Sequence, residues 1–296
     1  MFRDRILNVS IDRLTVIGYI KSIQDFQHTI IDDYSITEKM LPYSSLYGFN
    51  QTLQLVTGLG HISISNRENI VRYEYNPNTI AKHQLEVENK KILEQLKNIS
   101  FSRLDIAIDF DFESFTDIDI RCTRKVTGGI ITGITEKVET KYFGAFSSDI
   151  LYRFYDKTQE QQAKGKTDVK QGWWRLEVQL NTTRIVSDFL YSEYTPFYDM
   201  VMGYDNGFDE NFRTKCKNMK DFLFFKEVYL HRNYLSLLSR REKESFNRMK
   251  KEYEEIILKD YIIIGSLVQP ELDTIKQQLQ TLINSHNVFK IDFDKR

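Results

Sequence analysis

The sequence is poor in residues that break or cross-link a chain, with only 4 prolines and 2 cysteines among 296 residues. Cys122 and Cys216 form no metal-binding pattern, so we expect free thiols in a reducing compartment. No apolar run approaches the length of a membrane span, and Met1–Arg5 lacks the apolar segment of a signal peptide. These absences predict a cytoplasmic protein.

A charge excess is also lacking, since the net charge is −1, and composition alone therefore argues against a nucleic-acid binder. The charges are unevenly spread, however. Between Asn211 and Lys251 there are twelve Lys and Arg against four Asp and Glu, a net charge of +8. This segment is either a basic surface that docks on DNA or an ordinary solvated helix surface.

The apolar pattern predicts strands first and helices later. Alternating apolar and polar residues predict strands at 10–20, 51–56, 60–65, 69–75, 101–110, 137–144, 150–157 and 172–181. Helical spacing predicts helices at 79–98, 183–191, 218–230, 234–257 and 270–285, with a short helix expected at 111–120. We therefore expect an α+β fold, with a sheet-based domain over 1–182 and a helical C-terminal region over 183–296. The sheet is expected to be large and antiparallel, with flanking helices.

The strand at 150–157 carries a tyrosine between two cations. Side chains alternate faces along a strand, so Arg153, Tyr155 and Lys157 are expected on one face. Neighbouring cations favour the phenolate form of a tyrosine and can also hold a phosphate, as an activated nucleophile requires. The alternative is an edge tyrosine between two solvated cations.

Carboxylates recur on the other predicted strands. Asp105 and Asp109 share one face of the strand at 101–110, although strands are depleted in Asp. Glu74 follows Arg72, and Glu177 follows Arg175, with the same spacing of two. A hard divalent cation, Mg²⁺ or Mn²⁺, would explain such acids, and a hydrogen-bonded sheet surface is the alternative. Together these faces suit metal-assisted attack of a tyrosine on a phosphodiester.

Six short runs resemble, in the same order, those of the Rep_trans family of rolling-circle plasmid replication initiators, which is related to relaxases of conjugative elements. They lie at Ser10–Thr15, Arg72–Asn78, Phe101–Phe110, Glu139–Gly144, Tyr152–Lys157 and Trp174–Leu180. The resemblance covers most of the chain and is strongest between residues 69 and 180. It implies a relaxase-like fold, with a sheet that can consist of duplicated halves.

The resemblance implies an enzyme that nicks and closes origin DNA through a 5′-phosphotyrosine and leaves a 3′-hydroxyl primer. By it, Tyr155 corresponds to the nucleophile, and Arg153 and Lys157 to the cations beside it. Asp105 and Glu177 correspond to metal ligands, and Asp109 and Glu74 are further candidates. The chain lacks the His-hydrophobe-His motif of the wider relaxase class, and its five histidines are scattered.

The resemblance also implies a homodimer, a helicase partner and a C-terminal determinant of origin recognition. The residues expected to bind double-stranded origin DNA and single-stranded DNA are all cationic: Arg175, Arg240, Arg241, Lys243, Arg248, Lys250 and Lys251. The segment Arg240–Lys251 departs most from the family pattern, so origin specificity does not carry over.

Three other functions fit the same residues. A conjugative relaxase would perform the same chemistry at a transfer origin. A non-catalytic protein could bind single-stranded nucleic acid on the same sheet surface. A metal-dependent phosphodiesterase could use water as the nucleophile, with Tyr155 only positioning the substrate.

Overall fold

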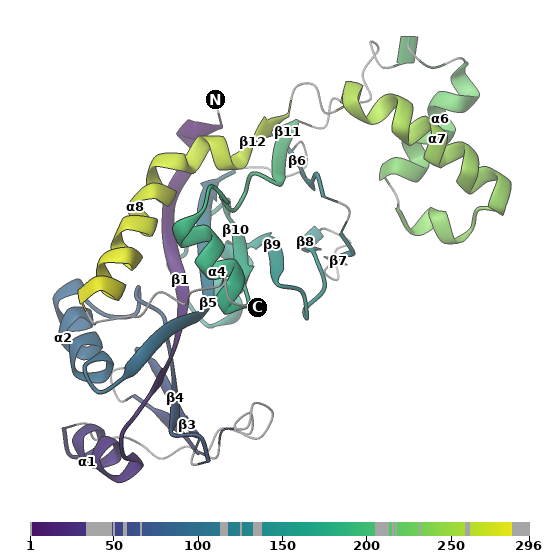
Figure 1. The fold of residues 1–296 in the computed structure, drawn as a ribbon. Helices are drawn as coiled ribbons and strands as arrows, with labels where there is room; N and C mark the ends of the chain where they lie inside the picture. The colour runs from purple at the N-terminus through teal and green to yellow at the C-terminus, as the bar shows by residue number, and fades with distance from the viewer. Residues whose placement is uncertain are drawn as a thin grey trace. The chain divides into compact units, whose positions relative to one another are not determined.

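The structure is a computed structural model. It describes residues 2–33, 49, 51–55, 58–65, 67–112, 118–124, 126–132, 138–204, 213–214, 216, 218–230, 232–257 and 261–285. The predicted α+β class is confirmed, because a large antiparallel sheet is flanked by helices and followed by a mainly helical region (Figure 1). No helix in the described part of the chain has both the length and the apolar character needed to span a membrane.

The main sheet has nine strands in the order β2-β3-β4-β1-β5-β10-β9-β8-β7. Its strands are β1 Ile6–Tyr19, β2 Gln51–Gln54, β3 Gly60–Ser65, β4 Ile70–Tyr75, β5 Lys97–Asp111, β7 Gly128–Thr132, β8 Val138–Phe143, β9 Ile150–Asp156 and β10 Trp173–Leu180. All neighbouring strands are antiparallel, and the two longest, β1 and β5, pair at the centre. Each predicted strand is present, with the predicted ends for β3 and shifted ends for the others.

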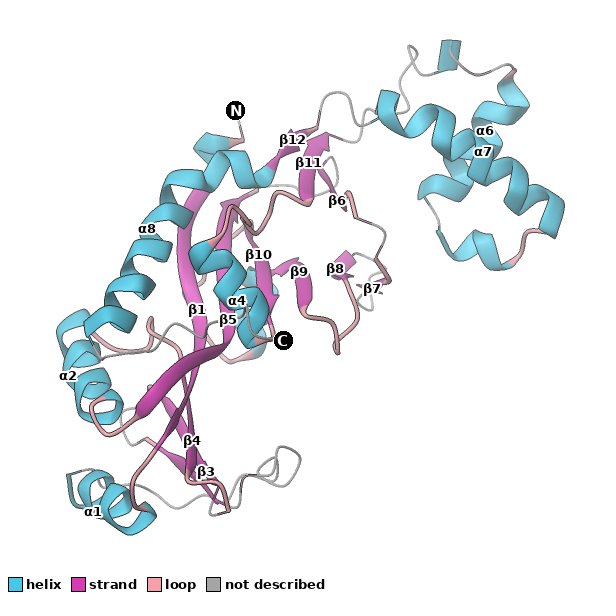
Figure 2. Cartoon of the chain, viewed as in Figure 1, coloured by secondary structure: helices cyan, strands magenta, loops and turns pink. Residues whose placement is uncertain are grey.

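One face of this sheet is apolar. On β5 the alternating residues Leu104, Ile106, Ile108 and Phe110 are all fully buried, as are Leu176 and Val178 on β10. Helices α2 (Lys82–Leu93), α4 (Thr183–Tyr191) and α8 (Ile264–Ser285) flank the sheet (Figure 2). Asn89 of α2 bonds to the hydroxyls of Tyr73 and Tyr75, and Gln280 of α8 donates to the carbonyl of Leu190. The opposite face is left for charged side chains.

Three short elements complete this part of the chain: the 3-10 helix η1 (Arg3–Arg5), α1 (Ile23–Asp33) and α3 (Lys157–Ala163). Arg3 of η1 donates to the carbonyl of Leu267 at 2.7 Å, which ties the start of the chain to α8. The Asp156 side chain caps α3 by accepting from the amide of Gln159 at 3.0 Å.

The prediction of a helix at 111–120 is wrong for the residues in this range that the structure describes as a regular element. Residues Ile118–Cys122 form strand β6, which pairs with β11 (Met200–Tyr204), and β11 in turn pairs with β12 (Ile262–Ile263). The sequence Ile118-Asp119-Ile120 alternates as a strand should, and β11 supplies the partner that its apolar side chains need. The C-terminal region therefore contains a small sheet as well as helices.

Helices α6 (Met219–Leu230) and α7 (Arg240–Ile257), with the 3-10 helix η3 (Arg232–Ser236) between them, form a small bundle. Its core consists of Phe222, Phe225, Val228, Tyr229, Phe246, Met249 and Tyr253. The start of α7 is set by a capping box. The Ser239 amide donates to Glu242 at 2.8 Å, and the Glu242 amide donates back to the Ser239 hydroxyl. The helix therefore starts at Arg240 and not at the predicted 234.

The chain divides into two compact units. The first draws on Met1–Glu113, Val126–Pro196 and Leu267–Arg296, and the second on Ser114–Lys125 and Phe197–Ser266. The expected single boundary after residue 182 differs from this division. Strand β6 joins the second unit through its pairing with β11, and most of α8 joins the first through α4.

Candidate active site on the polar face of the sheet

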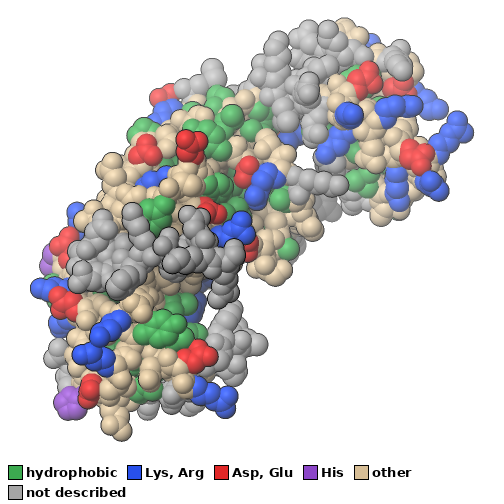
Figure 3. Space-filling view, in the orientation of Figure 1, with side chains coloured by type: hydrophobic (Ala, Val, Ile, Leu, Met, Phe, Trp, Pro, Cys, Tyr) green, Lys and Arg blue, Asp and Glu red, His purple; other side chains and the backbone are tan. Residues whose placement is uncertain are grey.

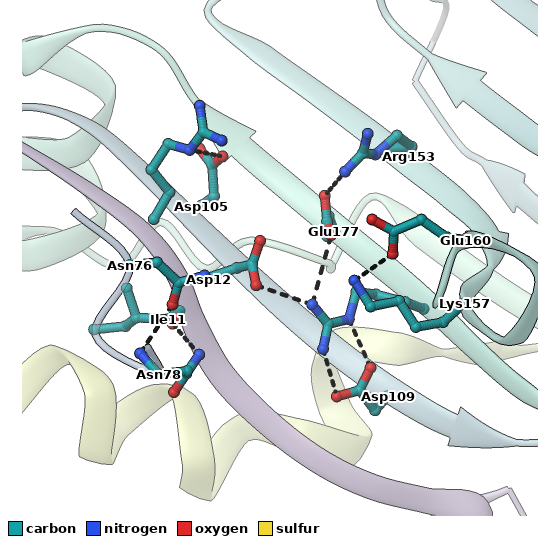
Figure 4. Close-up of polar contacts among 12 residues, drawn as sticks. Ile11, Asp12, Asn76, Asn78, Asp105, Asp109, Arg153, Lys157, Glu160 and Glu177 are labelled. Carbon is teal, nitrogen blue, oxygen red and sulfur yellow. Dashed lines mark hydrogen bonds and ion pairs between the residues drawn. The ribbon is translucent and has the colours of Figure 1, made fainter. Parts of the chain in front are cut away.

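On the polar face of the main sheet, the predicted nucleophile lies next to one predicted acid and two predicted cations. In the register of β9 and β10, Tyr155 lies opposite Arg175 and Arg153 lies opposite Glu177. Directly opposite residues of an antiparallel pair point to the same face, so these four side chains meet. Figure 4 shows Arg153 bound to Glu177, and Glu177 beside the arginine that contacts Asp12 and Asp109.

Tyr155 is held by an acid and two cations. Its hydroxyl donates to Glu177 Oε1 at 2.6 Å and accepts from Lys157 Nζ at 3.2 Å. The Arg153 guanidinium lies 4.5 Å from the centre of the Tyr155 ring and also binds Glu177 Oε2 at 2.5 Å. Tyr155 is 5% exposed, whereas the Arg153 side chain is 41% exposed. Arg153 is thus the member of this group that solvent reaches most easily.

The surroundings of Tyr155 favour its protonated phenol, whereas the two cations by themselves would favour the phenolate. Burial raises its pKa well above the usual value, and the neighbouring Glu177 carboxylate raises it further by its charge and hydrogen bond. Arg153 and Arg175 lower the pKa but do not offset these effects. The expectation of an activated tyrosine rested on the two cations and placed Glu177 at a metal, not at the Tyr155 hydroxyl. Attack by Tyr155 therefore needs a base, and Glu177 already accepts its hydrogen bond.

Lys157 reaches the tyrosine from a different element than expected. Strand β9 ends at Asp156, and Lys157 is the first residue of α3. Its ammonium group still contacts the Tyr155 hydroxyl, and it also pairs with Glu160 Oε2 at 2.5 Å. Burial raises the pKa of Glu160, but Lys157 and Lys164 outweigh it and lower that pKa to about 2. Glu160 therefore stays ionised and fixes Lys157 beside Tyr155.

Arg175 forms the buried support of the site. Its guanidinium donates to both oxygens of Asp109 at 2.7 and 2.9 Å, and to Asp12 on β1 at 2.9 Å. The Trp173 indole also donates to Asp109 at 2.8 Å. The side chains of Arg175 and Asp109 are 9% and 6% exposed. This burial leaves little of Arg175 for the predicted contact with DNA, and that role stays a prediction.

The remaining predicted acids lie farther along the same face. Asp105 forms a two-pronged pair with Arg103 at 2.8 and 2.7 Å, and Glu74 is bound by Arg72 and, at 3.3 Å, by Arg13. Burial raises the pKa of Asp105 despite Arg103. Burial also raises the pKa of Glu74, but Arg72 and Arg13 outweigh it and the pKa is lowered. Arg13 lies between these two acids, 3.9 Å from Asp105.

The four carboxylates do not fit a divalent cation as they are arranged. Asp105, Asp109, Glu74 and Glu177 each bind an arginine. In the part of the chain that the structure describes, no three His, Cys, Asp or Glu side chains are grouped to hold a metal ion. The expected Mg²⁺ or Mn²⁺ stays a prediction.

The sequence analysis missed Asp12, Arg13, Arg103, Trp173 and Glu160. A signal for one of them, Arg103, was present. In Arg72-Tyr73-Glu74, Arg103-Leu104-Asp105 and Arg175-Leu176-Glu177 a cation stands two residues before an acid. That spacing places both on one face of a strand, where they can pair. The repeated pattern therefore predicts ion pairs before it predicts metal ligands.

The predicted DNA-docking cations lie on α7 in the second unit. Arg240, Arg241, Lys243, Arg248 and Lys251 are exposed, Lys250 is half-buried, and Phe246 and Met249 turn the opposite side of the helix into the bundle core. Figure 3 shows Lys and Arg side chains gathered on the surface of this bundle. Their role in binding DNA stays a prediction.

Comparison with known proteins finds a matching family model and similar replication initiation proteins. Residues 121–255 match the model of the Rep_trans family, described as replication initiation factor. This match confirms the resemblance to Rep_trans. A curated Staphylococcus aureus replication initiation protein is 27% identical over 219 residues, which cover 72% of this chain and 62% of that protein. A second, from the same organism and with the same name, is 34% identical over 113 residues, 37% of this chain and 35% of that protein.

The chain thus spans about three fifths of the length of the first of these relatives. The matched residues 121–255 include the Tyr155 site and the cations of α7. A solved structure of a rolling circle replication initiator protein from Geobacillus stearothermophilus is 18% identical, covering 61% of this chain and 79% of that chain. Its TM-score is 0.37, so no conclusion about this chain follows from it.

Proposed function

We propose that this chain initiates rolling-circle replication of a plasmid by nicking and rejoining one strand of origin DNA through Tyr155. Support comes from the Rep_trans match and from the names of the S. aureus relatives. The observation that carries the proposal is the hydrogen bond of 2.6 Å from the Tyr155 hydroxyl to Glu177, with Lys157 and Arg153 beside it. A structural tyrosine has no need of an acid and two cations at its hydroxyl and ring.

The nicking step follows from these contacts. The Tyr155 oxygen attacks the scissile phosphorus as its proton passes to Glu177 Oε1, and an oxygen–phosphorus bond forms. The bond from phosphorus to the 3′ oxygen breaks, and that oxygen takes up a proton to become the 3′-hydroxyl primer. The 5′ phosphate stays on Tyr155 as an ester. The reverse reaction, with a 3′-hydroxyl as nucleophile, reseals the strand.

The cations stabilise the charge that develops on the phosphate. Lys157 Nζ lies 3.2 Å from the attacking oxygen and is fixed by Glu160. Arg153 is exposed on the solvent side of the ring, so an incoming phosphate meets it first. Arg175 is buried behind Glu177, at 3.8 Å from Oε1, and acts as a positioning residue. Preorganised charges of this kind commonly supply the largest part of a rate enhancement.

The wider activity is part of the same proposal. The cations of α7 would dock on origin DNA, and the enzyme would work as a homodimer with a helicase that extends the nick. These partners come from the family resemblance alone.

The experiment uses a supercoiled plasmid that carries the cognate origin. The wild-type chain should convert it to open circles and carry a covalent DNA adduct, and Tyr155→Phe should do neither. The variant should still bind origin DNA as the wild type does, because only the hydroxyl is removed. Nicking with adduct formation by Tyr155→Phe would refute the proposal.

A further inference from the structure

An aromatic pair beside Tyr155 takes no part in the steps above. Tyr142 on β8 lies directly opposite Arg153 on β9, so its side chain is on the polar face, one strand farther toward the sheet edge. Phe146, in the turn between β8 and β9, has its ring centre 5.2 Å from that of Tyr142, with the planes tilted by 59°. The two rings form one aromatic surface next to Arg153.

This surface is exposed and held in place. Phe146 is 76% exposed, although phenylalanine is normally buried. Its turn is ordered: the Ala145 amide donates to the Ser148 hydroxyl at 3.1 Å, and the Ser148 amide donates to the Ala145 carbonyl at 2.9 Å. Gly144, with φ of +112°, begins the turn, and a Cβ there would lie 2.8 Å from the Ile150 carbonyl. The chain thus presents a phenylalanine to solvent on a defined turn.

The space beside Tyr142 is open. Its partner on the edge strand β7 is Gly129, where an added Cβ would meet no described atom within 4 Å. Ile130 and Ile131, the next residues on that strand, are 58% and 50% exposed. A flat apolar ligand could therefore lie against Tyr142 and Phe146 over Gly129.

We propose that Tyr142 and Phe146 bind an unpaired nucleobase of the DNA strand whose phosphate lies at Tyr155. This inference rests on the proposed function and extends it to the substrate, which must be single-stranded there. Neighbouring strands lie only about 4.8 Å apart, so the rings and Arg153 can hold a base and a phosphate of one strand together. Bases stack on aromatic side chains with little sequence preference, and a base within a duplex offers no free face.

The Arg153 cation favours this occupant over an apolar peptide, because a nucleotide brings both a flat ring and a negative charge. A second copy of the chain, adding a strand to β7, is the other occupant that the edge would admit. The experiment separates the two.

The test compares two single-stranded probes of equal length and charge, an oligothymidylate and a strand of abasic sites. The wild-type chain should bind the oligothymidylate more tightly, since only it offers bases. Phe146→Ala should reduce that preference about fivefold or more and leave binding of the abasic strand unchanged. Phe146→Trp should keep the preference, because stacking and not the particular residue is required. Tyr191→Ala, at a 50% exposed aromatic on α4, serves as the control and should change neither affinity.

Gly129→Val provides a second test that removes no wild-type contact. The valine side chain would fill the space beside Tyr142 and should abolish the preference for bases. An unchanged preference for oligothymidylate over the abasic strand in both Phe146→Ala and Gly129→Val would overturn the inference. A variant that sediments as a monomer where the wild type sediments as a dimer, with its preference for bases unchanged, would overturn it too. Since binding alone is measured, a chain that prefers bases but forms no adduct would refute the proposed nicking and leave this inference standing.

Discussion

The cations of the polar sheet face and those of α7 are the same residue types in opposite environments. Arg175 is 9% exposed and is held by Asp109 and Asp12 in fixed geometry. Arg240 is 94% exposed on its helix and pairs with the exposed Glu244 at 3.0 Å. Buried cations with fixed partners can orient chemistry, whereas exposed cations supply affinity that salt can screen.

The largest effect is expected at Glu177. Glu177→Gln keeps the size of the side chain but removes the base that receives the Tyr155 proton, so nicking should slow by about 10²- to 10⁴-fold. The rate of the variant should rise with pH, because burial keeps the pKa of Tyr155 raised and hydroxide must then remove its proton. Single-turnover nicking of an origin oligonucleotide across a pH series measures both.

The control for Glu177→Gln is binding of the uncleaved strand, which should be as tight as in the wild type or tighter. Wild-type nicking rates in the variant would show that Glu177 only supports the sheet.

Next in size is the loss of the buried support. Arg175→Ala would leave Asp109 and Asp12 without their cation, which typically costs about 3–5 kcal/mol of unfolding free energy. Arg240→Ala, at an exposed pair in the second unit, should cost no more than about 0.5 kcal/mol. Urea unfolding of the two variants measures the contrast.

Lys90→Ala is the matched control within the first unit, since Lys90 pairs with Glu94 at 3.9 Å on the surface of α2. If Arg175→Ala destabilised the chain no more than Lys90→Ala, the buried network would not be the support described here.

The smallest effect per residue is expected on α7. Arg241, Arg248 and Lys251 share the face of the helix opposite Phe246 and Met249. Changing all three to Gln should weaken duplex binding and reduce the slope of log K against log salt by about 2–3. Fluorescence anisotropy with a DNA duplex over a range of salt measures the slope, and nicking of a short single strand should be unaffected. An unchanged slope would place DNA docking on another surface.

Much of the first unit could be predicted from the sequence because apolar and polar residues alternate along several of its strands, most clearly along β5. Leu104, Ile106 and Ile108 against Asp105, Ala107 and Asp109 define the two faces of β5, and the structure has both. Strand β6 is not decided by the sequence, because the alternation of Ile118-Asp119-Ile120 is too short to distinguish a strand from a short helix and its partner, β11, lies far along the chain. Local pattern contains no information about such pairing.

The sequence predicted which residues belong to the site better than it predicted which of them contact one another. Alternation placed Arg153, Tyr155, Arg175 and Glu177 on one face, but it could not show which of them bond. The register of β9 and β10 decides that, and it sets Glu177 within 2.6 Å of the Tyr155 hydroxyl. The same limit explains the protonated phenol, because burial of Tyr155 depends on neighbours from several strands.

The central claim is that the Tyr155 oxygen takes over the 5′ phosphate of the cleaved strand. The most direct test is mass spectrometry of the protease-digested adduct between the wild-type chain and nicked origin DNA. We expect the DNA-bearing peptide to contain Tyr155, with the phosphate on that side chain. A nucleotide attached to a different tyrosine, or cleaved DNA with a free 5′ phosphate and no attached peptide, would contradict it.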